Sequence, residues 1–333
     1  MYQYFTDDKY RQIALNKKNV NYQNNITSMD AFFVLLSGLD YETIDNLCIE
    51  VSKKMRSLFP REVYYAIQNR DNDHVFRFIV LKTAYEIIHS DNKIGSKLIN
   101  NHNASNWISH CLFEGELASR FAKLMGLDSD TAMKIGILHD IGRKFDQSFN
   151  HTIQGFEYLI NQGLKDEAFC TLTHSFLSST VNGVNKGNRC ANCDPAIDGF
   201  YIDENGRGVF KEGSTLDDMY KFLENYEYNQ YDIILNISDL MAMSKGITSP
   251  YDRMMDVYTR RKPDSRNNAF FKVCFINALN SMMYSITKDE SFNIIYNIKE
   301  FKSPKEIDEL LINTSNSFMD IYNEKISIKK QLL

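Results

Sequence analysis

The chain is poor in the two residues that interrupt helices. Glycine accounts for 15 and proline for 5 of its 333 residues, both below the typical shares of roughly 7% and 5%. Because these are the residues least favourable inside a helix, their scarcity favours a helical protein. Apolar residues make up 43% of the chain, which is too large a share for a disordered protein.

Long apolar runs and an excess of positive charge are also missing. The longest apolar stretch near the start, 31–36, is far shorter than the roughly 18 residues that a membrane-spanning helix requires. Residues 1–11 lack the apolar segment of a secretory signal. Lys and Arg number 38 against 43 Asp and Glu, which makes a nucleic-acid partner unlikely in electrostatic terms. We therefore expect a cytoplasmic protein with no membrane partner, and the sequence leaves its oligomeric state open.

Cysteine is scarce and scattered along the sequence. The six cysteines include one pair with metal-ligand spacing, Cys190-Ala-Asn-Cys193. A chain of this length does not need a disulfide scaffold, so we expect reduced thiols. A structural zinc ion needs four ligands, and because no second pair of this kind exists, zinc at Cys190 and Cys193 stays an open question.

The hydrophobic pattern divides the chain into three mostly helical parts. Residues 1–104 form a helical N-terminal region, 105–262 a core, and 263–333 a helical C-terminal region. Within the core, 182–215 contains two short apolar runs around Glu-Asn-Gly, which predict a small β-hairpin insertion. The expected fold class is all-α: a helical bundle core with this insertion and helical extensions at both ends.

Four histidines stand at the ends of two predicted helical hairpins. The first hairpin spans 107–142 and the second 151–176, and each has a glycine at its turn. Both ends of each hairpin carry a histidine: His110, His139, His151 and His174. If the hairpins pack side by side, these four imidazoles meet at one end of a helical bundle.

Two carboxylates extend this set. Asp140 directly follows His139, and such mixed nitrogen and oxygen ligands suit Mn, Fe, Zn or Mg. Asp239 lies in the apolar stretch 231–243, where a buried carboxylate must be paired, hydrogen-bonded or metal-bound. Asp232 lies near the start of the same predicted helix, where a carboxylate complements the helix dipole. We therefore prefer Asp239 as the candidate ligand.

The order of these residues resembles the HD-domain superfamily of metal-dependent phosphohydrolases. The family pattern is a His, a later His-Asp pair, found here in Gly-Ile-Leu-His-Asp-Ile-Gly, and a distal Asp. Two further histidines match those of the binuclear members, and the resemblance covers 106–261. It implies an HD-type bundle that holds two divalent ions about 3.5 to 4 Å apart. The implied ligands are His110, His139, Asp140, His151, His174 and Asp239.

The resemblance also implies how these ligands are shared. Asp140 would bridge the two ions, while His110, His139 and Asp239 would complete one site. His151 and His174 would complete the other. Mn or Fe are the favoured ions, and Mg, Zn or Ni are compatible with the same ligands.

The implied activity is hydrolysis of a phosphoester or phosphoanhydride by a metal-bridged hydroxide. The substrate would be a nucleotide or a related small phosphorylated molecule, and the catalytic residues would be Asp140 and Arg143. Arg143 either clamps the phosphate or complements the end of a helix dipole. After His174 the chain lacks the second histidine and the Gly-Tyr-Pro signature of the cyclic-di-GMP phosphodiesterases, which disfavours that substrate.

Several alternatives remain at this point. An HD-fold di-iron oxygenase would use the same ligands, and a non-catalytic nucleotide-sensing HD module would bind without turnover. Glu114, four residues after His110, either orients that histidine or faces solvent. Arg253 and the basic run 260–262 either guide an anionic substrate or form a solvated helix end, and we expect the solvated end.

Overall fold

The structure is a computed structural model of the chain, and its described residues fall into ten segments. These are 8–17, 20–23, 26–36, 106–146, 148–181, 184–187, 200–202, 208–243, 246–261 and 265–331. The helices predicted between 37 and 99 and the pair Cys190 and Cys193 lie outside them. Within these segments the fold is all-α with small antiparallel hairpins, as the sequence predicts.

The α-helices account for most of the described residues. They are α1 (Asp8–Asn16), α2 (Ser28–Leu36), α7 (Asn106–Met125), α8 (Ser129–Leu138), α9 (His151–Asn161), α10 (Phe169–Thr173), α12 (Thr215–Leu223), α13 (Gln230–Asp239), α14 (Pro250–Arg261), α15 (Ser265–Thr287) and α16 (Pro304–Gln331). Three short 3₁₀ helices are η1 (Ile141–Lys144), η2 (Glu290–Phe292) and η3 (Ile298–Glu300).

The strands form three two-stranded antiparallel sheets among the described residues. They are β1 (Ser178–Val181) with β2 (Val184–Gly187), β3 (Phe200–Ile202) with β4 (Gly208–Phe210), and β5 (Ala242–Met243) with β6 (Gly246–Ile247). In the second sheet Phe200 pairs with Phe210. This sheet confirms the predicted insertion hairpin, although the Glu-Asn-Gly turn itself lies outside the described residues.

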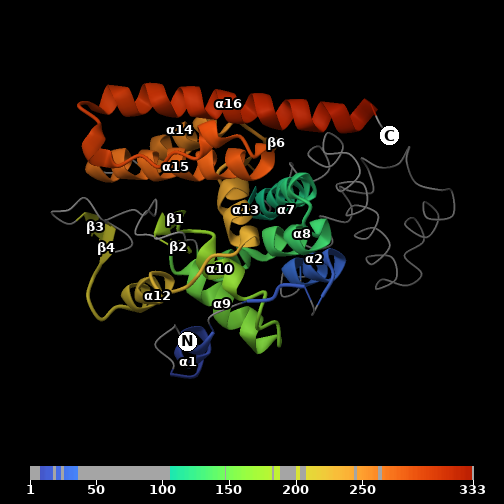
Figure 1. Ribbon diagram of the computed structural model, residues 1–333. Helices are drawn as coiled ribbons and strands as arrows, with labels where there is room; N and C mark the ends of the chain where they lie inside the picture. The colour runs from blue at the N-terminus through green and yellow to red at the C-terminus, as the bar shows by residue number, and fades with distance from the viewer. Residues whose placement is uncertain are drawn as a thin grey trace.

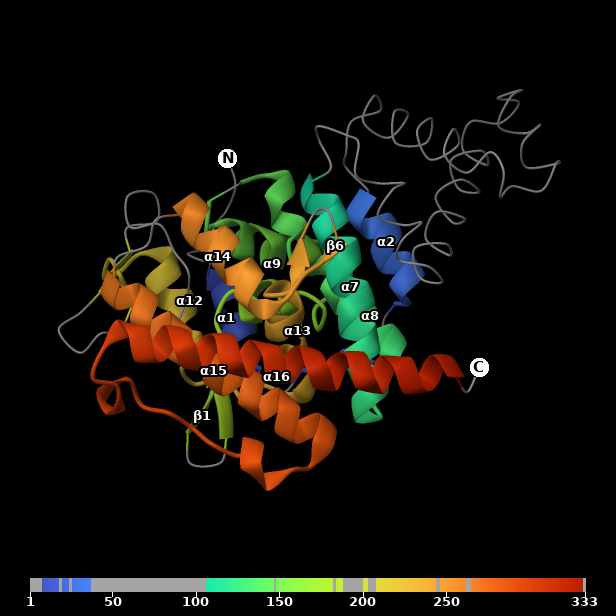
Figure 2. The same ribbon diagram turned by 90° about the horizontal axis from the view of Figure 1, so that it is seen from above.

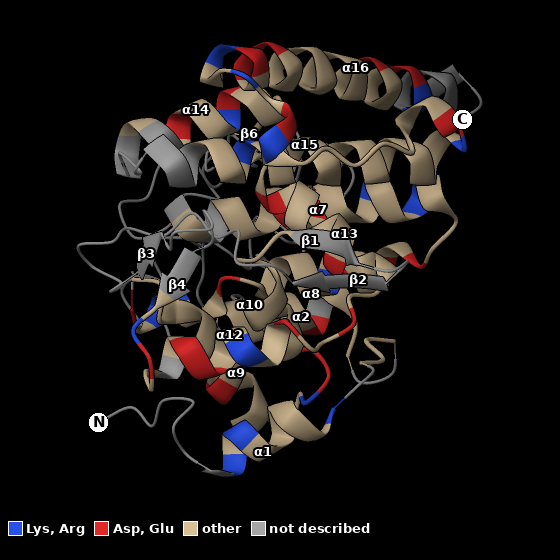
Figure 3. Ribbon diagram, turned by 60° about the vertical axis from the view of Figure 1, so that its left-hand side comes forward, with Lys and Arg blue, Asp and Glu red and all other residues tan. Residues whose placement is uncertain are grey.

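Helix α13 lies at the centre of the fold. Figure 1 shows it between α14, α15 and α16 above and α9, α10 and α12 below, and it contacts α7, α8, α10 and α15. Every residue from Tyr231 to Ser238 is buried, which explains why this stretch is apolar nearly all round. In Figure 3 α13 is mostly tan, whereas α12 and α16 carry several charged residues.

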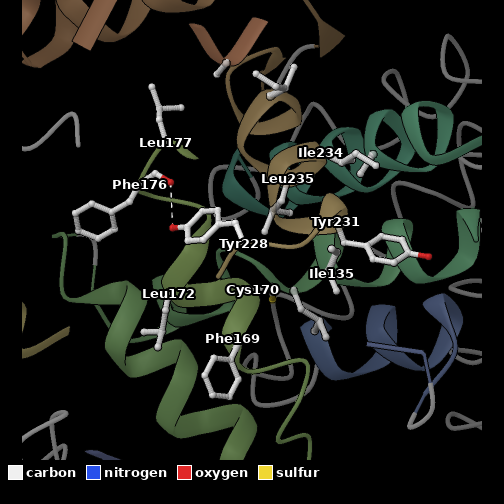
Figure 4. Close-up of a cluster of buried hydrophobic side chains, with 14 of the residues drawn as sticks. Ile135, Phe169, Cys170, Leu172, Phe176, Leu177, Tyr228, Tyr231, Ile234 and Leu235 are labelled. Carbon is white, nitrogen blue, oxygen red and sulfur yellow. Dashed lines mark hydrogen bonds between the residues drawn. The ribbon is translucent and has the colours of Figure 1, made fainter. Parts of the chain in front are cut away.

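Aromatic and aliphatic side chains join α13 to α10. Figure 4 shows Tyr228, just before α13, pointing towards the chain that follows α10. Its hydroxyl donates hydrogen bonds to the carbonyl oxygens of Thr173 and Phe176, both at 3.2 Å. The end of α10, where His174 lies, is therefore fixed by the start of α13.

Two glycines set the distance between α7 and α8. A Cβ on Gly136 would lie 2.7 Å from the Cα of Gly115, and a Cβ on Gly115 would lie 2.9 Å from the carbonyl oxygen of Met133. Gly126 adopts a φ of 74° after α7, and Asp128 caps α8 by accepting from two backbone N–H groups. The first hairpin thus forms as predicted, with its helices in close contact.

Helix α8 ends earlier than the sequence suggests. We predicted that it reaches Gly142, but the α-helix ends at Leu138 and the 3₁₀ helix η1 follows. At Gly142 a Cβ would overlap with the carbonyl oxygen of His151 and lie 2.6 Å from the nitrogen of Gly155. The change of helix type therefore lets η1 pack directly against the start of α9.

The sequence also favours helices from about 216 to 245, and the structure divides this stretch. Helix α12 ends at Leu223 and α13 begins at Gln230, and the connection between them contains the buried Tyr226 and Tyr228. Helix α13 ends at Asp239, and β5 and β6 occupy the following residues. The second helix of the hairpin predicted for 151–176 is also shorter than expected, since α10 covers only Phe169–Thr173.

Helix α14 ends the core, and α15 and α16 make the C-terminal region helical, as predicted. Pro250 is the first residue of α14, and the Ser249 hydroxyl accepts a hydrogen bond from the backbone N–H of Asp252 at 3.1 Å. Helix α16 packs along α15 and α14 and crosses over α15 when seen from above (Figure 2). None of the described helices has both the length and the apolar character needed to cross a membrane.

Candidate metal centre

The structure brings the six predicted ligands together from five different places in the fold, because His139 and Asp140 are adjacent. His110 lies on α7, His139 directly after α8, and Asp140 directly before η1. His151 begins α9, His174 follows α10, and Asp239 is the last residue of α13. Each ligand therefore stands at or near the end of an element, where a side chain can point across the bundle.

A first group comprises His110, Glu114, His139 and Asp239. One ligand atom from each of these residues lies within 4.8 Å of those of the other three. The Nε2 of His139 is 2.8 Å from the Glu114 Oε2, and the Nε2 of His110 is 3.0 Å from the Asp239 Oδ1. The two Nε2 atoms are 3.2 Å apart. Four side chains from α7, α8 and α13 thus converge on one point.

A second group comprises Asp140, His151 and His174. The Asp140 Oδ1 is 2.9 Å from the Nε2 of His151 and 3.4 Å from that of His174. The other oxygen, Oδ2, lies 3.6 Å from the Nε2 of His139 and 3.9 Å from that of His110. Asp140 therefore lies between the two groups, with one oxygen towards each.

These separations match ligands that share an ion. Nitrogen and oxygen ligands lie about 2.0 to 2.2 Å from a zinc-like ion, so two ligands at tetrahedral or octahedral angles are roughly 3.0 to 3.5 Å apart. The two Nε2 pairs, His110 with His139 and His151 with His174, are 3.2 and 3.3 Å apart. The spacing of both groups fits divalent metal ions.

Backbone carbonyls fix which nitrogen of each ring carries a proton. The Nδ1 of His139 is 2.6 Å from the Gly136 oxygen, and the Nδ1 of His151 is 2.6 Å from the Ser148 oxygen. The Nδ1 of His174 is 3.2 Å from the carbonyl oxygen of Cys170. Because a carbonyl only accepts, each Nδ1 carries a hydrogen, so the Nε2 that faces the centre has no hydrogen whenever its ring is neutral.

Several buried polar atoms of the centre lack a hydrogen-bond partner among the described residues. They are both carboxylate oxygens of Glu114, the Asp140 Oδ1 and the His110 Nδ1. Buried polar groups are nearly always satisfied, and an exception calls for an explanation such as a bound ion. The set of donor atoms and these unsatisfied carboxylate oxygens therefore fit a metal centre.

The burial of the centre shifts the pKa values of its groups. Burial raises the pKa of Glu114 to about 8, and burial together with the charge of Arg143 lowers the pKa of His151 to about 4. Burial opposes the charge on Asp140, but Arg143 and His139 outweigh it and hold the pKa of this carboxyl well below its usual range. Asp140 is therefore ionised, as a ligand must be.

Two arginines lie beside the candidate ligands. The Arg143 Nε donates to the Asp140 Oδ2, and the Arg253 Nε donates to the backbone oxygen of Asp239 at 3.4 Å. The Arg253 side chain is only 14% exposed, so our expectation that it belongs to a solvated helix end is wrong. The side chains of Asp239 and Arg143 are 23% and 21% exposed, which marks the side on which the centre meets solvent.

Three features of the centre were not settled by the sequence. Glu114 is fully buried and faces His139, which excludes the solvent-facing alternative, and its spacing of four residues from His110 was the available signal. The Ser175 hydroxyl donates to the Nε2 of His174 at 2.8 Å, a contact that the sequence does not suggest. Asp232 bonds to Tyr22 instead of joining either group, as the preference for Asp239 anticipated.

We compared the chain with protein-family models, with curated proteins and with solved structures, and none of them matches it. The candidate centre therefore depends on its own geometry and on the order of its residues.

Proposed function

We propose that this protein is a hydrolase that uses two divalent metal ions to cleave a phosphoester or phosphoanhydride of a small phosphorylated molecule such as a nucleotide. The main support for a bound metal is the contact between His151 and His174. Their Nδ1 atoms are committed to backbone carbonyls, so the neutral rings turn two lone pairs towards each other at 3.3 Å. When both rings are neutral, neither nitrogen can donate to the other, and a cation bound by both would account for the contact. The Ser175 hydroxyl, which donates to the Nε2 of His174 without the cation, would then turn away.

The ligands would be shared as the order of the residues implies. His110, His139 and Asp239 would hold one ion, His151 and His174 the other, and Asp140 would offer one oxygen to each. When bound, the ions would lower the pKa of a water molecule between them and stabilise negative charge on phosphoryl oxygens. The donor atoms suit Mn or Fe best, while Mg, Zn or Ni fit the same ligands less specifically.

The charge of the centre supports an anionic substrate. Three carboxylates, Glu114, Asp140 and Asp239, lie beside the two guanidinium groups of Arg143 and Arg253. Two divalent ions would ionise all three carboxylates, and the sum of four positive charges from the ions, two from the arginines and three negative charges would be an excess of three positive charges. A positive centre at the surface attracts phosphate groups.

Arg143 would serve as the phosphate-side residue of the centre. Its guanidinium holds Asp140 from the solvent side, and an arginine presents a planar set of donors that suits phosphate oxygens. The same contact fixes the rotation of the Asp140 carboxylate, which keeps one oxygen turned towards each group. Arg143 would thus both orient Asp140 and bind the substrate.

The test is hydrolysis by metal-loaded protein. We expect protein reconstituted with Mn²⁺ or Fe²⁺ to turn over a generic phosphodiester or at least one nucleoside triphosphate in a panel. Replacing both His139 and Asp140 by alanine should abolish turnover and bound metal together, as measured by elemental analysis. The matched control is Asp166→Asn, because Asp166 pairs with Lys17 away from the centre, and it should leave both unchanged.

Two results would overturn the proposal. Absence of turnover across the panel by protein that demonstrably contains two ions would exclude hydrolysis of this class. A mixed-valent iron EPR signal with oxygen consumption would instead favour the oxygenase alternative, because a Mn or Mg hydrolase gives no such signal.

A further inference from the structure

We propose that Glu114 is a direct ligand of the ion in the first group and that it makes the two metal sites unequal. The first site would be closed by protein ligands and bind its ion tightly, while the second would keep open positions and bind its ion more weakly. This inference rests on the metal centre of the proposed function and does not depend on the reaction. The resemblance to the HD superfamily did not assign Glu114 as a ligand.

The burial and the neighbours of Glu114 favour a role as a metal ligand. It is 0% exposed on α7, and its Oε2 lies 2.8 Å from the Nε2 of His139 and 3.6 Å from that of His110. The Oε1 has no hydrogen-bond partner among the described residues, and the Oε2 has one only if the Nε2 of His139 carries a proton. A carboxylate buried in this way is costly unless it is paired or coordinates a metal.

The local packing holds this carboxylate in place. Gly115 follows Glu114 and lies against Gly136 of α8, where a Cβ would lie 2.7 Å from the Cα of Gly115. The same Gly136 provides the carbonyl oxygen that accepts from the Nδ1 of His139. The close approach of α7 and α8 therefore fixes Glu114 and His139 relative to each other.

The nitrogen that faces Glu114 is the one without a hydrogen in the neutral ring. Since the Nδ1 of His139 donates to Gly136, the Nε2 meets the carboxylate either as a bare lone pair or as part of a protonated ring. In the first case a metal ion between nitrogen and oxygen explains the contact. In the second case Glu114 is only an ion-pair partner, and the two cases give opposite metal-binding results.

The ligand count explains why the sites would differ. The first site would have two histidines and two carboxylates of its own, Glu114 and Asp239, and a share of Asp140. The second would have two histidines and Asp140, whose other oxygen is bonded to Arg143. More anionic ligands hold a cation more tightly, while a site with three protein ligands keeps a position for water or substrate.

The experiment is a Mn²⁺ titration of the full chain, followed by the EPR signal of free Mn²⁺. Wild-type protein should bind two ions in two affinity classes. Glu114→Gln, which keeps the shape of the side chain and removes its charge, should weaken the tight class at least 10-fold and leave the weak class in place. His151→Gln should do the reverse and remove the weak class.

The matched control is Glu116→Gln. Glu116 lies two residues along the same helix, is also buried, and pairs with Arg120 at 2.9 Å. The Glu116→Gln variant should bind both ions as the wild type does. Circular dichroism of each variant checks that it is folded, and the absorption of the Co²⁺-loaded protein gives a second readout, because Glu114→Gln should change the ligand field of the tight ion.

Each outcome decides the inference. Unchanged or tighter Mn²⁺ binding by Glu114→Gln would overturn it, since an ion-pair partner of His139 holds a proton on the ring that competes with the metal. Wild-type protein that binds no ion, or two equal ions, would also overturn it. If the tight class depends on Glu114 but no phosphorylated compound is hydrolysed, the inference stands and the proposed reaction fails.

Discussion

Gly142 lies where η1 meets the first turn of α9. A side chain at this position would overlap with the carbonyl of His151 and lie 2.6 Å from the backbone nitrogen of Gly155. Both clashing atoms belong to the backbone, which has no flexible end that can move aside. The glycine of the His-Asp-Ile-Gly stretch is therefore required by the packing that places His151 next to Asp140.

Gly142→Ala should accordingly destabilise the protein and displace one ligand. We expect a loss of about 3 kcal/mol in the free energy of unfolding, the upper end of the cost of overpacking. The binding of Mn²⁺ to the second group should weaken at the same time, because His151 must shift with its carbonyl. Urea unfolding and Mn²⁺ titration measure the two effects.

Gly163→Ala is the control for this substitution. Gly163 adopts a φ of 82°, and a Cβ there would meet no described atom within 4 Å. Its cost comes from backbone conformation alone and should be about 1 kcal/mol, with no change in metal binding. Equal effects of the two substitutions on Mn²⁺ binding would show that the contact of η1 with α9 does not position the ligand.

The positions of the candidate ligands were largely predictable at this scale, and their partners were not. His110, His139, His151 and His174 stand at hairpin ends that hydrophobic periodicity reveals. The role of Arg253 was missed because its contact with Asp239 spans the β5–β6 hairpin, which the sequence shows as a continuation of helix. A single sequence contains no information about which distant side chains face each other in the bundle.

At the scale of elements, the junction of α10 with α13 positions His174. The Asn236 side chain donates to the carbonyl oxygens of Thr173 and His174, at 2.9 and 3.1 Å. One turn earlier on α13, the Asp232 Oδ1 accepts from the hydroxyls of Thr173 and Tyr22, at 2.9 and 2.8 Å. Two polar side chains of α13 thus hold the end of the shorter helix.

Asp232 should make the stability of the protein depend on pH. Burial raises its pKa from 3.8 to about 6, so the folded state binds a proton more tightly than the unfolded state. The contribution of Asp232 to the free energy of unfolding therefore increases as the pH falls through 6 and reaches its full size below pH 3.8. Relative to Asp232→Asn, the wild type should gain roughly 1 kcal/mol in the free energy of unfolding between pH 7.5 and pH 5.

The comparison with Asp232→Asn isolates this group from all others that titrate. The titratable side chains near it are the phenols of Tyr22, Tyr226 and Tyr228 and the thiol of Cys170. The pKa of each is raised, so none of them ionises in this range. Chemical unfolding at both pH values gives the difference. A wild type that loses stability relative to the variant at pH 5 would contradict the assignment.

Element types were predictable where the helical period is long and uninterrupted. The turn at Gly126 and the starts of α9 and α14 coincide with glycine, histidine and proline signals in the sequence. The gap between α12 and α13 was missed because its tyrosines, Tyr226 and Tyr228, look like helix core residues. Their burial comes from packing on α10 and its neighbours, which local propensity does not describe.

For the whole molecule, the centre joins chain segments that are far apart in sequence. Its ligands come from α7, α9 and α13 and from the ends of α8 and α10, so an ion would connect most of the helical core. The segment around Tyr22 reaches the same core, since Lys134 donates to its backbone oxygen. Nothing in the sequence indicates this last contact, and the division into three regions stays a prediction.

Metal should therefore stabilise the entire fold. An ion present at about 100 times its dissociation constant adds roughly 2.7 kcal/mol to the free energy of unfolding, which should raise the melting temperature by several degrees. Differential scanning calorimetry with and without Mn²⁺ measures this, and a chelator should reverse it. The variant with alanine at both His139 and Asp140 should show no shift, and an equal shift in that variant would place the bound ion elsewhere.

The anchoring of the imidazoles has a consequence for how the sequence can change over evolutionary time. His139, His151 and His174 are each oriented by a main-chain oxygen three or four positions before them. Every amino acid supplies that oxygen, so the orientation of the rings does not depend on the side chain at the anchoring position, although packing against Gly115 still requires glycine at 136. Lineages of such a protein can therefore change at the anchoring positions of His151 and His174 while the rings keep their orientation.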